Sequence, residues 1–295
     1  MRNKFIECLT KYAREHEHIV LIVGDLGYGV VEEFADTFPN RFFNAGVAEQ
    51  NMAGLAAGLA SEGCHVFTYS IANFPTFRCA EQIRNDIAYH NLSVTTVSVG
   101  GGLAYGALGY SHHAVQDFAL MRAMPNMTIY SPGDPVEVEA CLQHLVTHGG
   151  PSYFRLGKTG EKPFHTNKPK ILDGSWLPIK VSGHDKAIVT TGTALQYVNE
   201  FADPIGLNSS DLYSLPVWSM TSKHAQSKWL ENYQTVVTFE NHLLDGGFGS
   251  WLLEAASQIP NLNTKIKPSF LQDSVCGEVG SETALTMASQ VIPPL

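Results

Sequence analysis

One acidic side chain stands at the start of a helical stretch built almost wholly of small residues. Glu49 lies in the segment Asn44–Met52, NAGVAEQNM, which contains no basic residue. A buried carboxylate without a cationic neighbour shares a proton readily, which is useful in acid–base chemistry. A stripe of small residues follows along one side of the expected helix: Gly54, Ala57, Gly58 and Ser61. The alternative is structural, because an acid also suits a helix N-terminus and glycines also permit close packing.

A glycine-rich segment ends in two adjacent histidines. Residues 100–117 read GGGLAYGALGYSHHAVQD, with five glycines before His112 and His113. Histidine is the side chain best suited to exchange protons near neutral pH, so this loop is a second candidate for chemistry. A mobile surface loop with solvent-facing histidines is the alternative. The glycines match neither a P-loop nor Gly-x-Gly-x-x-Gly.

Aromatic and basic residues follow two other expected strands. Phe74 and Phe77 lie just before a helix and could clamp a flat ring, or could fill a domain interface. Arg155 and Lys158 follow the last strand of the first half, where they could hold a phosphate. Ordinary surface charge explains that pair equally well.

The elements that must position these residues alternate along the chain. Helices are expected over 3–17, 47–62, 78–89, 117–124 and 135–147, and strands over 18–23, 41–44, 65–69, 93–99, 127–130 and 152–156. Asp134 and Pro135 form a typical helix start. Alternating strands and helices predict a parallel sheet, whose ligands bind beyond the carboxyl ends of the strands. The loops of interest are therefore 24–29, 44–48, 70–77 and 100–117.

Two domains are expected in a chain of 295 residues. The first spans 1–160. A stretch rich in proline and glycine, 161–183, reads as a linker. The second domain, 184–295, resumes the alternation with strands at 187–191, 209–214 and 234–240 and helices at 194–201, 222–232 and 247–258. The fold class is α/β in both domains.

Composition excludes several classes of protein. A net charge of −9 with only 19 Lys and Arg argues against binding nucleic acid or an acidic membrane surface. No apolar run is long enough to span a membrane, and the N-terminus lacks the apolar core of a signal peptide. The cysteines are odd in number and scattered, which favours free thiols in the cytoplasm: Cys8, Cys64, Cys79, Cys141 and Cys276. His144 and His148 have metal-ligand spacing but no evident third ligand, so no metal site is predicted.

Five motifs in order, spread over nearly the whole chain, resemble the transketolase family of thiamine-diphosphate enzymes. They are Gly24–Gly27, Asn44–Met52, Glu81–Asn85, the segment 111–127 and Val236–Ser250. The resemblance is to the pyrimidine-binding domain together with the C-terminal domain. It implies a parallel-sheet domain of the thiamin-diphosphate-binding fold followed by a smaller α/β transketolase C-terminal domain.

The resemblance implies a cofactor site. In this family the acid of the Gly-Val-x-Glu motif, here Glu49, faces N1′ of the aminopyrimidine and favours its imino tautomer. Asp25 and Leu26 match the turn near the thiazolium. Phe74 and Phe77 are both candidates for the aromatic stacked on the pyrimidine. The expected cofactor-binding set is completed by one further residue, Arg78.

The resemblance also implies a substrate site. His112 matches the family histidine that relays protons on substrate hydroxyls, and Lys158 falls where members carry an arginine for the sugar phosphate. His113 and Arg155 are the other expected substrate-binding residues. Leu108 stands where many transketolases have an acid, so the substrate is left open.

The family's metal-binding Gly-Asp-Gly is absent from the sequence. The chain thus resembles the C-terminal subunit of a split transketolase, with Mg²⁺ held mainly by a separate diphosphate-binding subunit. A heterotetramer with two of each chain is expected. The implied activity is transfer of a two-carbon ketol unit from a ketose to an aldehyde, and the match at Lys158 implies that the ketose is phosphorylated. Alternatives are a 2-oxo acid dehydrogenase beta subunit, a deoxyxylulose-phosphate-synthase-like enzyme, or a non-catalytic scaffold subunit.

Overall fold

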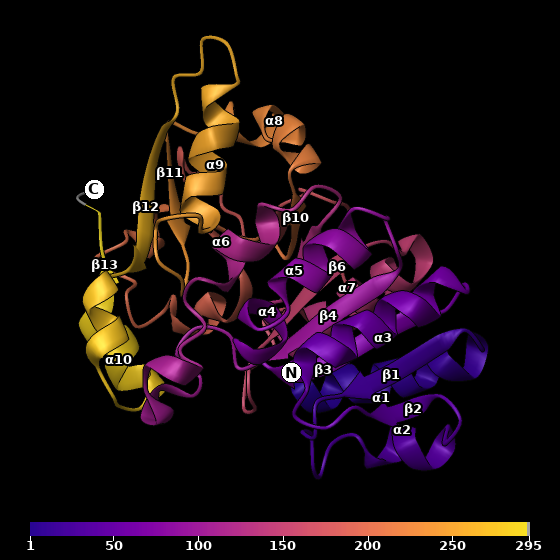
Figure 1. Cartoon of the computed structure of the whole chain (residues 1–295). Coiled ribbons are helices and arrows are strands. Elements are labelled where there is room, and N and C mark those ends of the chain that lie inside the picture. Colours follow the sequence, from indigo (N-terminus) through magenta and orange to yellow (C-terminus); the bar gives the residue numbers. More distant parts are fainter. Residues whose placement is uncertain (294–295) are drawn as a thin grey trace.

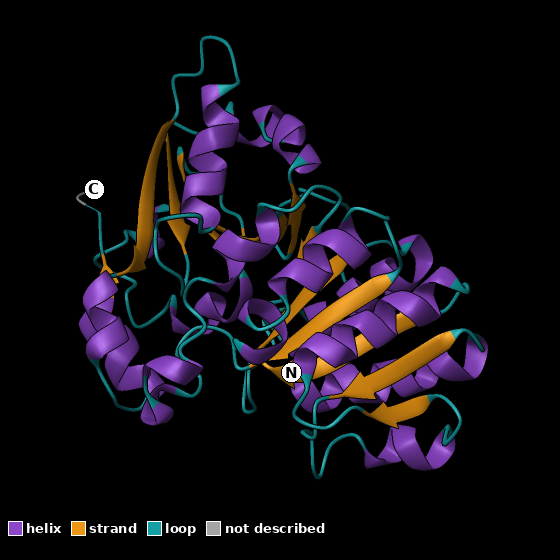
Figure 2. Cartoon of the chain, in the orientation of Figure 1, coloured by secondary structure: helices purple, strands orange, loops and turns teal. Residues whose placement is uncertain are grey.

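The computed structural model describes residues 1–293, so residues 294–295 of the expected second domain lie outside it. Its first sheet comprises β1 (Ile19–Val23), β2 (Phe42–Asn44), β3 (His65–Ile71), β4 (Val94–Val99), β5 (Thr128–Tyr130), β6 (Ser152–Leu156) and β10 (Val217–Ser219). The strand order is β10-β5-β6-β4-β3-β1-β2. Figure 1 labels all of these strands except β5, and Figure 2 shows the strands in orange with purple helices packed around them. All neighbours are parallel except β10, which runs antiparallel to β5. The predicted parallel sheet is confirmed.

Helices cover both faces of this sheet, which explains the unbroken apolar runs of its strands. The helices of this half are α1 (Arg2–Glu15), α2 (Glu32–Thr37), α3 (Glu49–Ser61), α4 (Phe74–Phe77), α5 (Ala80–Gln82), α6 (Asp117–Arg122) and α7 (Pro135–His148). In β1, Val20 and Ile22 join the core beneath α3, whereas Leu21 and its alternate neighbours join the core beneath α1 and α7. The expected cap is present, because the Asp134 side chain accepts a hydrogen bond from the Glu137 backbone N–H.

The prediction of one continuous α-helix over 78–89 is wrong in detail. The segment contains α5 and a π-helical stretch at Ile83–Ala88, while Arg78 caps the separate short helix α4 that precedes it. Sequence periodicity does not distinguish π from α winding over so short a stretch, and π segments often occur near functional sites. Phe74 begins α4 and Arg78 caps its C-terminus, so both follow the end of β3.

The second sheet comprises β7 (Leu177–Lys180), β8 (Lys186–Thr190), β9 (Asp211–Ser214), β11 (Thr235–Phe239), β12 (Lys265–Leu271) and β13 (Gln290–Val291). Its order is β13-β12-β11-β8-β9-β7, and its helices are α8 (Ser227–Leu230), α9 (Phe248–Ser257) and α10 (Glu282–Ser289). A 3₁₀ turn at Gly192–Tyr197 replaces part of the helix expected at 194–201.

Two strands pair across the boundaries that the sequence suggests. β7 lies inside the expected linker yet pairs with β9, so the end of the linker belongs to the second sheet. β10 lies inside the expected second domain yet pairs with β5 of the first sheet. The two halves therefore share hydrogen-bonded structure.

The halves also meet through an ion pair between α6 and α9, which lie side by side in Figure 1. Glu254 accepts hydrogen bonds from Arg122 at 2.7 Å and from Lys223 at 2.6 Å. The bond from Arg122, more than any other contact, lowers the pKa of Glu254 to about 2.

This contact should weaken in acid. The folded pKa lies below the ordinary value of 4.5, so the carboxylate contributes stability above pH 4.5 that is lost as the pH falls toward 2. We expect the melting-temperature difference between the native chain and Glu254→Gln to be largest at pH 6–7 and to shrink toward zero below about pH 3. Melting curves at several pH values measure it, and a difference independent of pH would contradict the assignment.

Candidate functional site

The predicted site residues gather at the carboxyl edge of the first sheet. The ends of β1, β3, β4 and β6 lead directly into the segments that hold Asp25, Phe74, the loop 100–117 and Lys158. Because parallel strands end at one edge, residues far apart in sequence meet there. Glu49 reaches the same edge as the first residue of α3.

Glu49 is buried, with 3% of its surface exposed. One carboxylate oxygen accepts a hydrogen bond from Arg78 Nη1 at 3.0 Å, and the other from Ser70 Oγ at 3.4 Å. Gly24 borders the acid, since a Cβ at that position would lie 3.8 Å from Oε1. The expectation of a carboxylate without a cationic partner is therefore wrong. Arg78 supplies the charge from 29 residues away in sequence.

Arg78 links the acid to the histidine loop through an aromatic ring. Its guanidinium carbon lies 3.9 Å from the centroid of the Phe74 ring, a cation–π contact. The His112 ring meets the same phenylalanine edge-on, with centroids 5.2 Å apart. The acid, the cation, the aromatic ring and the imidazole thus form one contiguous row.

Burial, aided by the positive charge of Arg78 and by His113, lowers the pKa of His112 from its ordinary value of 6.5. The ring is therefore neutral at pH 7, able to accept a proton at one nitrogen while donating from the other. Ser111 Oγ lies 2.9 Å from Nδ1 of His112. This pairing leaves Nε2 as the atom available to a ligand.

A cavity of about 470 Å³ opens beside this row. Its lining comprises Asn73, Phe74, Phe77, Arg78, Tyr110, Ser111 and Gln116. Phe77 is 48% exposed, a large exposed fraction for an aromatic side chain. Phe77 is therefore available for stacking on a flat ligand, whereas Phe74 is half-buried and already contacts Arg78 and His112.

His113 does not face this cavity. Its side chain is fully buried, and Nε2 lies 3.4 Å from the Gly106 carbonyl. The backbone carbonyl of the same residue accepts a 2.6 Å hydrogen bond from the Asn73 amide, which ties the histidine loop to the start of α4. The predicted contact between His113 and a substrate is not supported, because its ring packs inside the protein.

Asp25 adopts a left-handed backbone conformation, with φ of 57°. The Asn44 side chain stabilises this turn by accepting from the Asp25 N–H at 3.1 Å and donating to its carboxylate at 2.9 Å. The hydrogen bonds from Asn44 and Tyr28 lower the pKa of Asp25, which keeps it ionised. Non-glycine residues seldom adopt such a conformation without a local reason, and here the interlocked amide supplies one.

A second, smaller cavity of about 190 Å³ lies beside the Asp25 turn. Its lining includes Leu26, Tyr28 and Tyr105, together with Arg2, which sequence reasoning missed. Arg2 and Tyr105 both line this cavity, and the Lys158 ammonium lies 5.2 Å from the centroid of the Tyr105 ring. Two cations therefore border one edge of the site. Nothing near Arg2 in the sequence marks it as more than a helix-start residue.

Arg155 is buried, unlike Lys158. Its side chain is 2% exposed and forms an ion pair with Asp117 at 2.7 Å. Its other nitrogens donate to the Asn241 side chain and to the Ala114 carbonyl, both at 2.6 Å. The prediction that Arg155 binds substrate phosphate is wrong, because its donors are already engaged inside the protein. Lys158, by contrast, is exposed.

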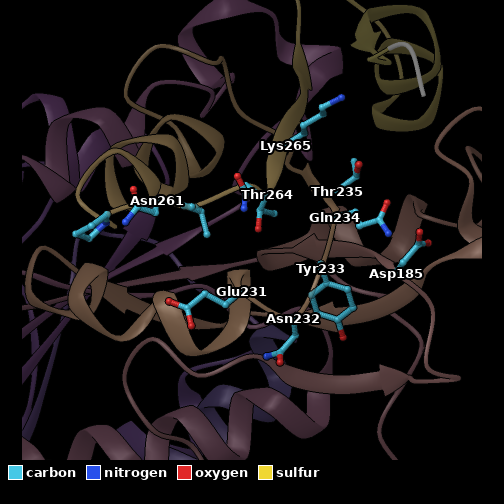
Figure 3. Close-up of a pocket in the computed structure, with 12 residues that line it drawn as sticks. Asp185, Glu231, Asn232, Tyr233, Gln234, Thr235, Asn261, Thr264 and Lys265 are labelled. Carbon is cyan, nitrogen blue, oxygen red and sulfur yellow. The ribbon is translucent and has the colours of Figure 1, made fainter.

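A cavity of about 680 Å³ lies elsewhere. Figure 3 shows Asp185, Tyr233, Gln234, Thr235 and Lys265 along its wall, at the amino ends of the second sheet's strands. Parallel sheets bind ligands at the opposite ends of their strands. This cavity also contains none of the predicted site residues, so the 470 Å³ cavity is the better candidate.

Within residues 1–293, no three His, Cys, Asp or Glu side chains are grouped so as to hold a metal ion. The same residues contain no helix that is both long and apolar enough to cross a bilayer. The expected free cysteines are unpaired in the structure.

Comparison with known proteins identifies a matching family, similar sequences and a similar solved structure. Residues 1–160 match the family described as the transketolase, pyrimidine-binding domain. A putative transketolase C-terminal section from Methanocaldococcus jannaschii is 33% identical to this chain, and the match covers 97% of this chain and 90% of that protein. One subunit of an apulose-4-phosphate transketolase from Phocaeicola vulgatus is 29% identical, covering 88% and 84% respectively. A solved structure described as a split gene transketolase, inactive beta4 tetramer, superposes with a TM-score of 0.82 at 29% identity, over 97% of this chain and 92% of that one.

Proposed function

The chain belongs to the transketolase family, and from this premise we propose that it is the pyrimidine-binding subunit of a split, thiamine-diphosphate-dependent ketol transferase. The observation that carries the proposal is the buried Glu49 carboxylate beside the cavity lined by Phe74, Phe77 and Arg78. A relative that is itself named as one subunit of a transketolase supports the existence of a second chain.

The residues present fit the aminopyrimidine half of thiamine diphosphate. The cavity is lined by Phe74, Phe77 and Arg78, and Arg78 is the hydrogen-bond partner of the Glu49 carboxylate. Among the described residues, the buried Oδ1 of Asn73 at the cavity wall has no hydrogen-bond partner. Glu49 would hold the proton shared with a nitrogen of the pyrimidine ring, and Phe74 or Phe77 would cover that ring. Asp25 and Leu26 would border the thiazolium part of the cofactor. When bound, the cofactor supplies an electron sink for breaking and forming a carbon–carbon bond beside a carbonyl. Magnesium, in this proposal, is held mainly by the partner chain.

His112 is the residue we assign to proton movement on the substrate. Its neutral ring borders the cavity against Phe74, and Ser111 holds its Nδ1. Lys158 and Arg2, at the rim near Tyr105, are suited to an anionic group such as a sugar phosphate. The proposed substrates are therefore a phosphorylated ketose donor and an aldehyde acceptor.

Replacing His112 with Asn should lower kcat for ketol transfer about 10²-fold, because general acid–base groups contribute roughly 10²–10⁴. The asparagine can still hydrogen-bond a hydroxyl, so the KM for the ketose should change little. Steady-state kinetics of the complex with the partner subunit measure both constants. His148→Asn, an exposed histidine of α7, is the matched control. An unchanged kcat in His112→Asn would remove this residue from the mechanism.

The partner would dock on the open side of the site. The exposed face of α3 carries Gly54 and Gly58, where an added Cβ would have no atom of residues 1–293 from outside the helix within 4 Å, and Leu55, which is 40% exposed. Val47, just before the helix, is 70% exposed. A group of exposed apolar residues is typical of an interface. We propose a heterotetramer with two of each chain, because two-fold symmetry is the usual arrangement. The unpaired cysteines support a cytoplasmic location within the same proposal.

Calorimetry with thiamine diphosphate and Mg²⁺ tests the central claim. We expect weak binding by this chain alone and at least about tenfold tighter binding once the partner subunit is added. Equal affinity with and without the partner would overturn the shared site. Binding by the partner alone, unchanged on adding this chain, would overturn it as well.

Activity assays separate the remaining alternatives. Turnover of a ketose donor with an aldose acceptor supports the transferase, whereas release of carbon dioxide from pyruvate supports a dehydrogenase beta subunit or a deoxyxylulose-phosphate-synthase-like enzyme. A scaffold subunit would leave the assembled complex without turnover, and Glu49→Gln would then change nothing.

A further inference from the structure

We infer that Asn241, a residue of the second domain, is a positioning residue for His112. It fixes the Arg155 side chain, and through it both ends of the loop 100–117 that carries the histidine. The inference rests on the proposed function only in the role given to His112. The placement of the loop is a property of the chain itself.

Asn241 is held from two sides and is 3% exposed. Its Oδ1 accepts a hydrogen bond from Arg155 Nη1 at 2.6 Å, and its Nδ2 donates to Thr193 Oγ1 at 2.6 Å. Its carbonyl accepts a third bond from Arg155 Nη2 at 3.3 Å. Because both ends of the amide are engaged, the side chain has one orientation, and that orientation sets the guanidinium plane.

Arg155 passes this constraint to the end of the loop. Its Nη2 donates to the Ala114 carbonyl at 2.6 Å, and its Nε donates to Asp117 at 2.7 Å. The guanidinium carbon lies 4.3 Å from the centroid of the Phe118 ring. Ala114 is two residues beyond His112, so a shift of this anchor moves the histidine.

The start of the loop rests on the same two side chains. A Cβ on Gly101 would lie 2.5 Å from Arg155 Nε, and a Cβ on Gly102 would lie 2.5 Å from Asn241 Nδ2. Gly102 and Ala114 are joined by a pair of backbone hydrogen bonds at 2.9 and 2.8 Å. Glycine is therefore required where the loop starts, and the stem is closed directly over Arg155 and Asn241.

The second domain supports the middle of the loop as well. The Gly280 N–H donates to the Gly106 carbonyl at 3.3 Å, and Leu285 of α10 packs against the same glycine. An apolar cluster joins the two parts: Leu103, Val115, Leu271, Val275 and Leu285. Figure 1 shows the magenta loop segment lying beside α10. The second domain thus contacts the loop 100–117 both where its two ends meet and at its middle.

The test compares Asn241→Ala with the matched control Glu254→Gln, which removes a contact between the two halves that does not involve the loop stem. In the complex with the partner subunit, we expect Asn241→Ala to lower kcat about 10–100-fold, as a small misplacement of a catalytic group does, with the ketose KM nearly unchanged. Glu254→Gln should keep kcat within about threefold of the native complex. Asn241→Asp retains an acceptor for Arg155 and should recover most of the loss.

A second readout needs no activity. In ¹H–¹³C spectra of the isolated chain, the His112 ring signal is assigned by its loss in His112→Asn. The pKa of His112 lies below its ordinary value because of burial, Arg78 and His113, and it should return toward 6.5 in Asn241→Ala. Limited proteolysis within residues 100–110 should accelerate in the same variant.

These readouts separate failure of the inference from failure of the proposed function. If Asn241→Ala leaves both the His112 titration and the proteolysis rate at native values, the positioning role is overturned. It is also overturned if Glu254→Gln lowers kcat equally. If Asn241→Ala fails to fold, Asn241→Asp carries the test, and a native His112 titration with a depressed kcat there would contradict the inference. A native complex without turnover would refute the function while leaving the spectroscopic result to stand.

Discussion

Glu49→Gln is expected to lower kcat of the assembled complex by about 10³-fold, within the range of roughly 10²–10⁴ that acid–base groups contribute. Glutamine has nearly the same shape as glutamate, and its amide can still accept a hydrogen bond from Ser70. It cannot share a proton with a ring nitrogen as a carboxylate does. Arg78, left without its partner, is 46% exposed at its side chain and can be solvated. The loss should therefore appear in turnover far more than in folding.

Steady-state kinetics, together with calorimetry of thiamine diphosphate, measure this effect. Glu62→Gln is the matched control, since Glu62 is an exposed acid that ends the same helix. We expect the control to keep native kcat and native affinity. A Glu49→Gln complex with kcat within about threefold of native would show that this carboxylate does not take part in proton transfer.

Arg155→Met should lower the free energy of unfolding by about 3–5 kcal/mol, the usual cost of removing one member of a buried ion pair. The substitution leaves Asp117, which is fully buried, without its cation. The Ala114 carbonyl and the Asn241 side chain lose donors at the same time. Urea denaturation of the full chain measures the difference.

Lys158→Met gives the contrasting result. Lys158 is exposed, so its replacement should change the free energy of unfolding by about 0.5 kcal/mol or less. It should instead raise the KM for a phosphorylated ketose more than that for its unphosphorylated analogue. A large loss of stability in Lys158→Met, or native stability in Arg155→Met, would reverse the roles assigned to these two residues.

The sequence was most informative where a local pattern decides the structure. The β-branched run of β1 and the capped start of α7 were predictable, because burial on both faces and a side-chain cap leave local marks. β12 was missed, since its sequence KIKPSFL contains lysines and a proline. β10 was missed because three residues show no period.

The site was predictable in its members but not in their contacts. The family motifs led to Glu49 and His112, yet the Arg78 partner of Glu49 depends on a meeting of two segments that only the folded sheet brings together. Likewise Arg155 and Lys158 are three residues apart, and charge alone does not reveal which one is buried. Arg155 lies within β6, all of whose residues are buried, while Lys158 lies beyond the end of that strand.

The strand that crosses from the second half into the first sheet limits how this protein can be divided. Without Val217–Ser219, the backbone groups of Thr128–Tyr130 would form an uncovered sheet border, a ready template for association with other chains. A fragment ending at residue 160 should therefore precipitate rather than persist as a free module. We therefore expect the two domains to unfold together, in a single cooperative melting transition.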